Sequence, residues 1–400
     1  MSMNRGAKVT IREVAVAELP AGPELARPAE SEPAEPVVLH RRNRCTATGC
    51  ESRQDVPVTT NMLAEITEQP AALRSTIDAL LPATGEAERL ARDTRHVLFI
   101  GRGTSDNAAV YGSYLLQAFA GRLATLASPS IATAYRARVD LSGVLAVALS
   151  QSGRTGEVVE TLTWARDCGA LAVAITNSVS SPLAEAAELA LVTCAGEERA
   201  VPATKTYTAQ LAAIAVLALS LGARLDISEL RRVPDAVAEM LARPDDLEPL
   251  VNELATVPGV VVSGRGLAYS CALEIALKLK EACYLRAMGL SWADLLHGPI
   301  AVVDTQTPAI LVAADSGPTL AGTIELAHRV RDAGARAYAI GGRPPLADAC
   351  DRALAGPDLP EWLAPIGLVV PGQLLTEALA RRLGINPDSP RRLSKITQTG

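Results

Sequence analysis

Short apolar runs alternate with amphipathic segments along the middle of the chain. The runs that have the length of buried strands lie at residues 96–100, 144–150, 170–176 and 189–194. A segment with helical spacing of apolar residues follows each of the first three runs, and a longer apolar helix is expected from about Tyr207 to Leu221. Strands that alternate with helices in this way predict βαβ units and a parallel sheet covered on both faces.

The same pattern starts again in the second half of the chain. Residues 261–283, VVVSGRGLAYSCALEIALKLKEA, repeat the order of residues 97–119, VLFIGRGTSDNAAVYGSYLLQAF: a strand, a Gly-Arg-Gly turn and a helix. The two turns are about one domain length apart. Later strands of the second half are expected at residues 309–315, 335–342 and 366–372. We therefore predict an α/β protein with two tandem parallel-sheet domains.

The join between the domains is expected between about Arg224 and Glu253. Helical residues there are broken by Pro234 and Pro244, which cannot continue a helix without losing a main-chain hydrogen bond. The domains that follow from this join span residues 58–235 and 236–400.

A tail of different composition precedes the first domain. Residues 1–57 are rich in Pro, Ala, Glu and Arg without a sustained period, which predicts disorder. Cys45 and Cys50 lie in this tail with His40 nearby, but their spacing fits no zinc pattern and no second pair follows, so we expect no metal site. Beyond the tail, Pro70 is expected to start the second of two short helices.

Composition narrows the classes of function. Hydrophobic residues make up 48% of the 400 residues and aromatic residues 3%, so Ala, Leu, Val and Ile must form the cores, as is typical of parallel α/β proteins. The net charge of −6 does not favour nucleic acid or an anionic membrane as partner. No apolar run approaches the roughly 20 residues of a membrane span, the start is no secretory leader, and seven irregularly spaced cysteines indicate no disulfide framework. We expect a cytoplasmic protein.

The segment SQSGRTGE, from Ser150, is the first candidate site. It follows a predicted buried strand and opens a predicted helix. The hydroxyls of Ser150, Ser152 and Thr155 and the amide of Gln151 are donors, and the glycines let main-chain N–H groups approach an anion at the helix N-terminus. No lysine follows the glycine as in a nucleotide P-loop, so a monophosphate suits the segment better. The alternative is an ordinary turn with a hydroxyl N-cap.

Two further segments are expected near the same place. The turn GRGTS brings Thr104 and Ser105 to the end of the preceding strand in sequence, and ligands of open parallel sheets lie beyond the carboxyl ends of the strands. The segment VPATKTYT, residues 201–208, interrupts an apolar region ahead of the long helix. It is either a loop over the ligand or a helix start, with Thr204 or Thr206 as cap and Lys205 as a surface charge.

Charged residues in the second half suggest catalysis. Glu274, Lys278 and Glu281 fall on one face of a predicted helix. They are either a solvated ion-pair stripe or, because their neighbours are apolar, buried charges that must be paired or functional. His297, in the turn HGP, is either structural or functional. Lys395 lies in a C-terminal segment that would ordinarily fray, but flanking apolar residues indicate docking, and a docked lysine can become nucleophilic.

Taken in order, these motifs resemble a known family. GRGTS, SQSGRTGE, ATKTYT, ALEIALKLKEA, LLHGP and PRRLSK occur as in the isomerase half of glucosamine-6-phosphate synthase, and they are similar to amino-sugar-phosphate deaminases built from two sugar-isomerase (SIS) domains. EITEQP, residues 65–70, resembles the opening segment of that half. The resemblance covers about residues 60–400. It implies two flavodoxin-like, three-layer SIS domains, the second with a catalytic C-terminal tail.

The resemblance also implies a role for each residue. The residues that it places against the substrate or its phosphate are Gly103, Thr104, Ser105, Ser150, Gln151, Ser152, Thr155, Val201, Ala203 and Glu274. Glu281 is the base that moves a proton between C1 and C2, while Lys278 and Glu274 orient this group. His297 assists ring opening in a neighbouring subunit's site, which implies a homodimer with a shared active site. Lys395 lies over the substrate and either assists ring opening or binds the carbonyl carbon. No cofactor is implied, because an imine or enolamine forms from the substrate's own nitrogen.

Departures from the family pattern shape the functional prediction. Ala203 stands where the synthase has a serine that touches substrate, and Asp294 where a glutamate is usual. No glutaminase domain is expected in the short region before the SIS domains, so we predict a deaminase that converts glucosamine 6-phosphate to fructose 6-phosphate and ammonia. An alternative is a synthase-like aminotransferase that uses free ammonia or a separate glutaminase subunit. Another is a non-catalytic sugar-phosphate sensor, although the first 57 residues show no helix-turn-helix periodicity.

Overall fold

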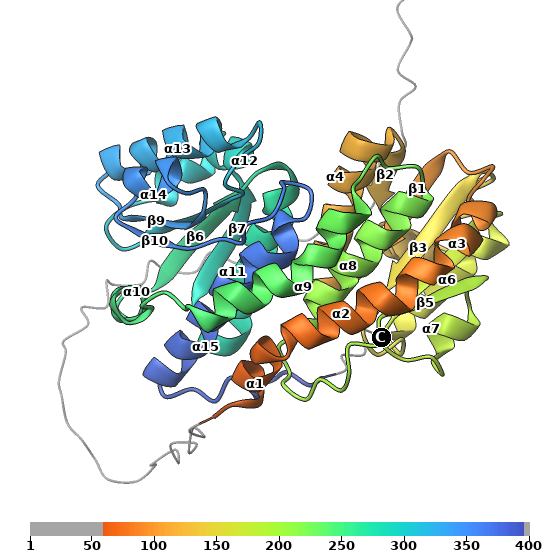
Figure 1. Cartoon of the computed structure of the whole chain (residues 1–400), viewed down its shortest axis with the longest axis horizontal. Helices are drawn as coiled ribbons and strands as arrows, with labels where there is room; N and C mark the ends of the chain where they lie inside the picture. The colour runs from red at the N-terminus through yellow and green to blue at the C-terminus, as the bar shows by residue number, and fades with distance from the viewer. Residues whose placement is uncertain (1–58, 396–400) are drawn as a thin grey trace, which may run out of the picture. The chain divides into compact units, whose positions relative to one another are not determined.

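The computed structural model describes residues 59–395 (Figure 1). The predicted tail, with Cys45 and Cys50, lies outside the described residues. The strands of the first half are β1 His96–Ile100, β2 Leu123–Leu126, β3 Val144–Leu149, β4 Leu171–Thr176 and β5 Leu189–Val192. Those of the second half are β6 Gly259–Gly264, β7 Arg286–Ser291, β8 Ala309–Ala313, β9 Ala337–Gly341 and β10 Arg352–Leu354.

These strands form two parallel sheets with the same winding. The first has the order β2-β1-β3-β4-β5 and the second β10-β9-β8-β6-β7. In each sheet the first strand pairs with the second on one side and with the third on the other. This order is that of flavodoxin-like folds. The prediction of two tandem, three-layer parallel α/β domains is confirmed.

Helices cover the sheets and fill the space between them. Their bounds are α1 Asn61–Thr67, α2 Gln69–Leu80, α3 Thr84–Leu90, α4 Thr104–Leu115, α5 Ser130–Thr133, α6 Gly156–Asp167, α7 Pro182–Glu185, α8 Lys205–Ser220, α9 Ile227–Ala242, α10 Glu248–Leu254, α11 Tyr269–Cys283, α12 Trp292–Leu296, α13 Leu320–Asp332, α14 Pro345–Ala349 and α15 Ala364–Arg382. One apolar core joins β1 and β6 through α4, α8, α11 and α15 (Figure 1). No helix within residues 59–395 is long and apolar enough to cross a membrane.

Two sequence predictions about helices are wrong. Residues 366–372 were expected to form a strand but lie in α15, where nearly every side chain is buried. An apolar run that is buried on all sides has no polar face, so periodicity cannot separate a buried helix from a buried strand. Pro234 was expected to break a helix but lies inside α9, flanked by the buried Val233 and Val237. Tertiary packing thus outweighs the local cost of the missing hydrogen bond there.

The fold brings three distant segments to one place. β1 and β3 are neighbours, so the turns that follow them lie side by side at one edge of the first sheet. α11 of the second half packs against α4 of the first half. Beyond α15 the chain returns to the first half, where the Asp388 carboxylate accepts the main-chain N–H groups of Asn61 at 2.7 Å and Met62 at 2.8 Å. The main-chain N–H of Val201 also donates to the Asp388 carbonyl, at 3.2 Å.

Candidate active site

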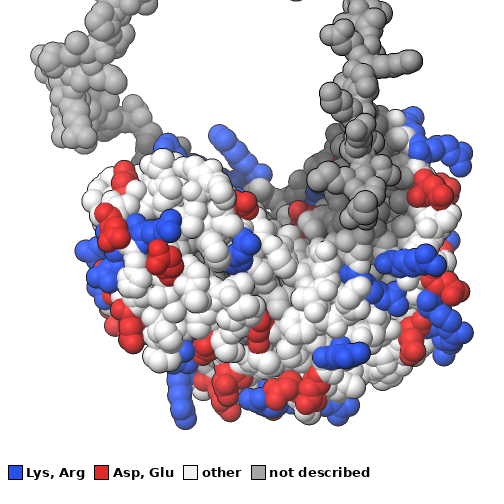
Figure 2. Space-filling model, turned by 90° about the horizontal axis from the view of Figure 1, so that it is seen from above, with Lys and Arg blue, Asp and Glu red and all other residues white. Residues whose placement is uncertain are grey.

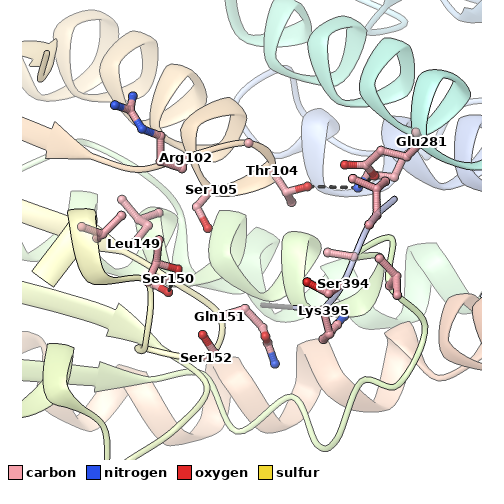
Figure 3. Close-up of a pocket in the computed structure, with 17 residues that line it drawn as sticks. Arg102, Thr104, Ser105, Leu149, Ser150, Gln151, Ser152, Glu281, Ser394 and Lys395 are labelled. Atoms are coloured by element: carbon pink, nitrogen blue, oxygen red, sulfur yellow. Dashed lines mark hydrogen bonds and ion pairs between the residues drawn. The ribbon is translucent and has the colours of Figure 1, made fainter. Parts of the chain in front are cut away.

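These three segments enclose a cavity of about 320 Å³ (Figure 3). The predicted site residues that line it are Gly103, Thr104, Ser105, Ser150, Gln151, Ser152, Thr155, Val201, Ala203, Lys278, Glu281 and Lys395. Glu274 is buried behind the cavity wall, and His297, exposed at the end of α12, is not among the residues that line the cavity. The fold therefore collects every predicted site residue of one chain at a single cavity except these two.

The loop from Ser150 to Thr155 is a cradle of hydroxyl groups between β3 and α6. Ser150 Oγ accepts the main-chain N–H of Gly153 at 3.2 Å and lies 3.2 Å from Thr155 Oγ1. Thr155 is the N-cap of α6, but its side chain makes no capping bond, which argues against the ordinary-cap alternative. The curled loop, its hydroxyls and the N-terminus of a 12-residue helix are suited to a small anion.

Ser105 extends this cradle from α4. Its oxygen accepts a hydrogen bond from Gln210 Nε2 at 3.0 Å, so its own proton is directed elsewhere, and Ser105 lines the cavity. A hydroxyl whose oxygen is already occupied in this way serves as a donor to an anion. Gln210, from the apolar helix α8, was missed by the sequence analysis. The signal was an amide within the mostly apolar stretch of residues 209–220, since a buried polar group needs a partner.

Charged side chains of α11 form the opposite wall. Lys278 Nζ lies 2.6 Å from Glu281 Oε2, 3.3 Å from Glu274 Oε1 and 3.0 Å from Thr104 Oγ1. Glu274 also accepts from Thr104 at 3.0 Å and from Asn107 Nδ2 at 2.7 Å. The side chains of Glu274 and Lys278 are 0% and 1% exposed, whereas that of Glu281 is 23% exposed. The solvated-stripe alternative is therefore wrong for this face of the helix.

Burial and ion pairing determine which of these side chains carry a proton. Burial would lower the pKa of Lys278, but the carboxylates of Glu274 and Glu281 outweigh it and hold that pKa above its usual value. Burial raises the pKa of Glu274, an effect that Lys278 and the Asn107 hydrogen bond partly offset. Lys278 thus stays an ammonium at neutral pH and cannot be a base. Among the residues that line the cavity, Glu281 is the carboxylate that can accept a proton.

The remaining wall comes from residues 201–203 and the C-terminal tail. Val201 and Ala203 line the cavity, as the loop alternative expected, and Thr204 makes no side-chain capping bond. Lys205 is no surface charge: its side chain is 3% exposed and its Nζ lies 2.5 Å from Glu68 Oε2. Lys395 Nζ donates to Glu198 Oε2 and to the Ala200 carbonyl, both at 2.7 Å.

Each cation that lines the cavity is already paired with a carboxylate. Arg102, a residue that the sequence analysis missed, makes two hydrogen bonds to Glu157, at 2.7 and 2.8 Å. Lys278 and Lys395 have the carboxylate partners described above, so neutral donors are the main groups left for an anion. On the face shown in Figure 2, basic and acidic side chains are interspersed, without a large area of one sign. Within residues 59–395, no three His, Cys, Asp or Glu side chains gather to hold a metal ion.

Gly153→Ala is expected to weaken the binding of inorganic phosphate about tenfold or more, since a lost hydrogen bond of roughly 1.4 kcal/mol has that effect on Kd. Gly153 has a φ of +64°, and a Cβ there would lie 2.2 Å from Ser181 Oγ, so the cradle must deform. Isothermal titration calorimetry measures the change. Gly85→Ala in α3 is the control, because nothing lies within 4 Å of its Cβ position. An unchanged affinity in Gly153→Ala would show that the anion binds elsewhere.

The chain is similar to known proteins over most of its length. The SIS domain model matches the chain twice, over residues 90–220 and 253–379. The glutamine–fructose-6-phosphate aminotransferase (isomerizing) of Pyrococcus horikoshii is 34% identical over 341 residues, which are 84% of this chain and 57% of that protein. The chain thus spans little more than half the length of this curated relative.

Two solved structures are similar over most of the described chain. The C-terminal domain of glucosamine-fructose-6-phosphate aminotransferase from Francisella tularensis has a TM-score of 0.76 and 28% identity, and the match covers 83% of this chain and 98% of that domain. A candidate phosphosugar isomerase from Silicibacter pomeroyi has a TM-score of 0.76 and 31% identity, and the match covers 82% of this chain and all of that one.

Proposed function

The chain belongs to the SIS domain family, and from this premise we propose that its cavity converts an amino sugar 6-phosphate to a ketose phosphate and ammonia. Glucosamine 6-phosphate, which would give fructose 6-phosphate, is the proposed substrate. One observation carries the proposal: a hydroxyl cradle suited to a phosphate and a carboxylate held by a buried ammonium share one cavity. In Figure 3, Glu281 lies apart from Ser150 and Ser152, and we place the sugar in the cavity of about 320 Å³ that all three line.

The chemistry requires one proton to move between adjacent carbons. In the open-chain sugar, Glu281 takes the proton from C2, next to the aldehyde, and C1 is then protonated. The resulting C2 imine reacts with water, which breaks the C–N bond, so that glucosamine 6-phosphate and water yield fructose 6-phosphate and ammonia. A single positioned carboxylate suffices for this transfer. Phosphate binding in the distant cradle supplies the energy that places C1 and C2 at Glu281.

Lys278 and Lys395 have different parts in this proposal. Lys278 is enclosed by Glu274, Glu281 and Thr104, so it orients the base and stays charged. Lys395, on the tail, lines the cavity and is partly exposed there, and in this proposal it would lie over the sugar and bind the carbonyl oxygen during ring opening. His297 lies outside the cavity of its own chain, so we assign it to the cavity of a second copy in a homodimer. A fully active monomer in analytical ultracentrifugation would overturn that assignment.

A second candidate runs the same steps in reverse. The relative from Pyrococcus horikoshii is named as an aminotransferase, and this chain spans 57% of its length. The cavity would then take fructose 6-phosphate and ammonia, supplied as free ammonia or by a separate glutaminase subunit. The chemistry at Glu281 is common to both directions, so the direction is decided by assay.

The experiment measures ammonia release from glucosamine 6-phosphate, coupled to detection of fructose 6-phosphate. We expect stoichiometric formation of both products. Glucosamine 6-phosphate formed from fructose 6-phosphate and ammonium, with no release in the forward assay, would favour the aminotransferase. Tight binding of either sugar phosphate without turnover in either direction would contradict an enzyme and indicate a sensor.

A further inference from the structure

Glu198 is a buried carboxylate beside the cavity that no step above uses. Its side chain is 0% exposed. Its Oε1 accepts the main-chain N–H groups of Thr204 at 2.8 Å and Thr206 at 3.1 Å. Its Oε2 accepts the Thr206 hydroxyl at 2.6 Å and the Lys395 ammonium at 2.7 Å. One carboxylate therefore joins the turn that leads into α8 to the C-terminal tail.

The segment that carries Glu198 is itself fixed from α1. Glu65 accepts the main-chain N–H of Arg199 and that of Ala200, the latter at 3.3 Å. The Ala200 carbonyl is the second acceptor for the Lys395 ammonium, at 2.7 Å. Lys395 therefore docks against two acceptors, two residues apart, on a segment whose backbone is held by another helix. Such a geometry leaves little freedom in the position of the ammonium.

Glu198 and Lys395 stabilise each other through their opposite charges. A buried carboxylate without a cation is destabilising, so Lys395 stabilises the buried Glu198 while Glu198 holds the tail in place. The tail has a second attachment at Asp388, which binds the start of α1 and the main-chain N–H of Val201. Between these attachments lie Leu393 and Ser394, which line the cavity. The position of the tail and the shape of residues 201–206 are thus linked through Glu198.

We propose that Glu198 is a positioning residue, which holds the Lys395 ammonium at the cavity and couples docking of the C-terminal tail to the loop 201–206. The expected effect on turnover rests on the proposed function, whereas the coupling between the tail and the loop does not. None of the hydrogen bonds of Glu198 described above goes to the cradle at residues 150–155. Loss of its charge should therefore lower kcat more than it weakens the binding of phosphate.

A double-mutant cycle tests whether Glu198 acts through Lys395. Glu198→Gln and Lys395→Met are each expected to lower kcat about tenfold or more, the effect of roughly 1.4 kcal/mol in the transition state, with the Kd for inorganic phosphate changed less than about threefold. The double variant should be no slower than Lys395→Met alone, and Glu198→Asp should recover part of the loss. If the losses in kcat of the two single variants multiply in the double variant, Glu198 and Lys395 act independently and the proposal is wrong.

Hydrogen exchange tests the same coupling without turnover. Glu198→Gln is expected to raise amide exchange in residues 383–395, and Lys395→Met to raise it in residues 198–206, with no further rise in the double variant. Glu197→Gln is the matched control, since Glu197 pairs on the surface with Arg199 at 2.8 Å. If Glu198→Gln fails to fold, Lys395→Met still tests the link from the tail side. Unchanged exchange at 198–206 in Lys395→Met contradicts the coupling, even where turnover is normal.

Discussion

Replacing Glu281 with glutamine is expected to lower kcat for glucosamine 6-phosphate by about 10²- to 10⁴-fold, the usual contribution of a positioned general base. The amide has the shape of the carboxylate and can still contact the cavity, but it cannot accept the proton from C2. Lys278 is a permanent ammonium here, so no neighbour on α11 can take over the role. The loss should fall on kcat, because the phosphate cradle is untouched.

Initial rates and calorimetry separate these two effects. The Kd for fructose 6-phosphate is expected to stay within about threefold of the wild-type value, which is less than 0.7 kcal/mol. Glu325→Gln is the matched control, since Glu325 pairs with Arg329 on the exposed face of α13, at 3.1 Å. A Glu281→Gln variant with near-normal kcat would remove this carboxylate from the mechanism.

Lys278→Met is expected to reduce the free energy of unfolding by about 3–5 kcal/mol, because it leaves a buried charge without its partner. Glu274 is 0% exposed and would keep only the neutral donors Thr104 and Asn107. Catalysis should fall as well, since Glu281 loses the ammonium 2.6 Å from its carboxylate. Urea denaturation followed by circular dichroism measures the stability change.

The pH dependence of this deficit has a definite sign. Burial raises the pKa of Glu274, and in Lys278→Met the lost ammonium no longer opposes that rise. A raised carboxyl pKa means that the folded protein binds the proton more tightly than the unfolded chain, so stability increases as pH falls through the folded pKa. The deficit should therefore be smaller at pH 5 than at pH 8. Adding Glu274→Gln should recover part of the stability, whereas a wild-type midpoint in Lys278→Met would contradict the buried pair.

The sequence predicted the central strands and the edge strand β5, but not the edge strands β2, β7 and β10. β3 and β4 are continuous apolar runs because helices cover both of their faces, so composition alone marks them. β2, with the sequence LATL, and β10, with RAL, are edge strands of only four and three residues, too short to show a strand pattern. Such strands are defined by their neighbours in the sheet, which a local pattern cannot show.

The site residues also divide into those that a local pattern predicts and those that only the three-dimensional packing defines. The residues at the ends of β1 and β3 were predictable, because neighbouring parallel strands bring their carboxyl ends to one edge. Glu198 lies 197 residues from Lys395 in the chain, and Gln210 lies 105 residues from Ser105. No spacing rule joins such pairs. Their roles follow only from the three-dimensional packing of the tail and of α8.

Proton NMR of the sugar phosphate in D₂O with the enzyme tests the central claim most directly, because it follows both the carbon skeleton and the transferred proton. The account predicts conversion of glucosamine 6-phosphate to fructose 6-phosphate, with deuterium entering C1 of the product, and neither change with Glu281→Gln. The measurement is repeated with fructose 6-phosphate and ammonium to cover the reverse direction. If both sugars bind, yet neither conversion nor deuterium at C1 or C2 is seen, the proposed proton transfer at Glu281 is wrong.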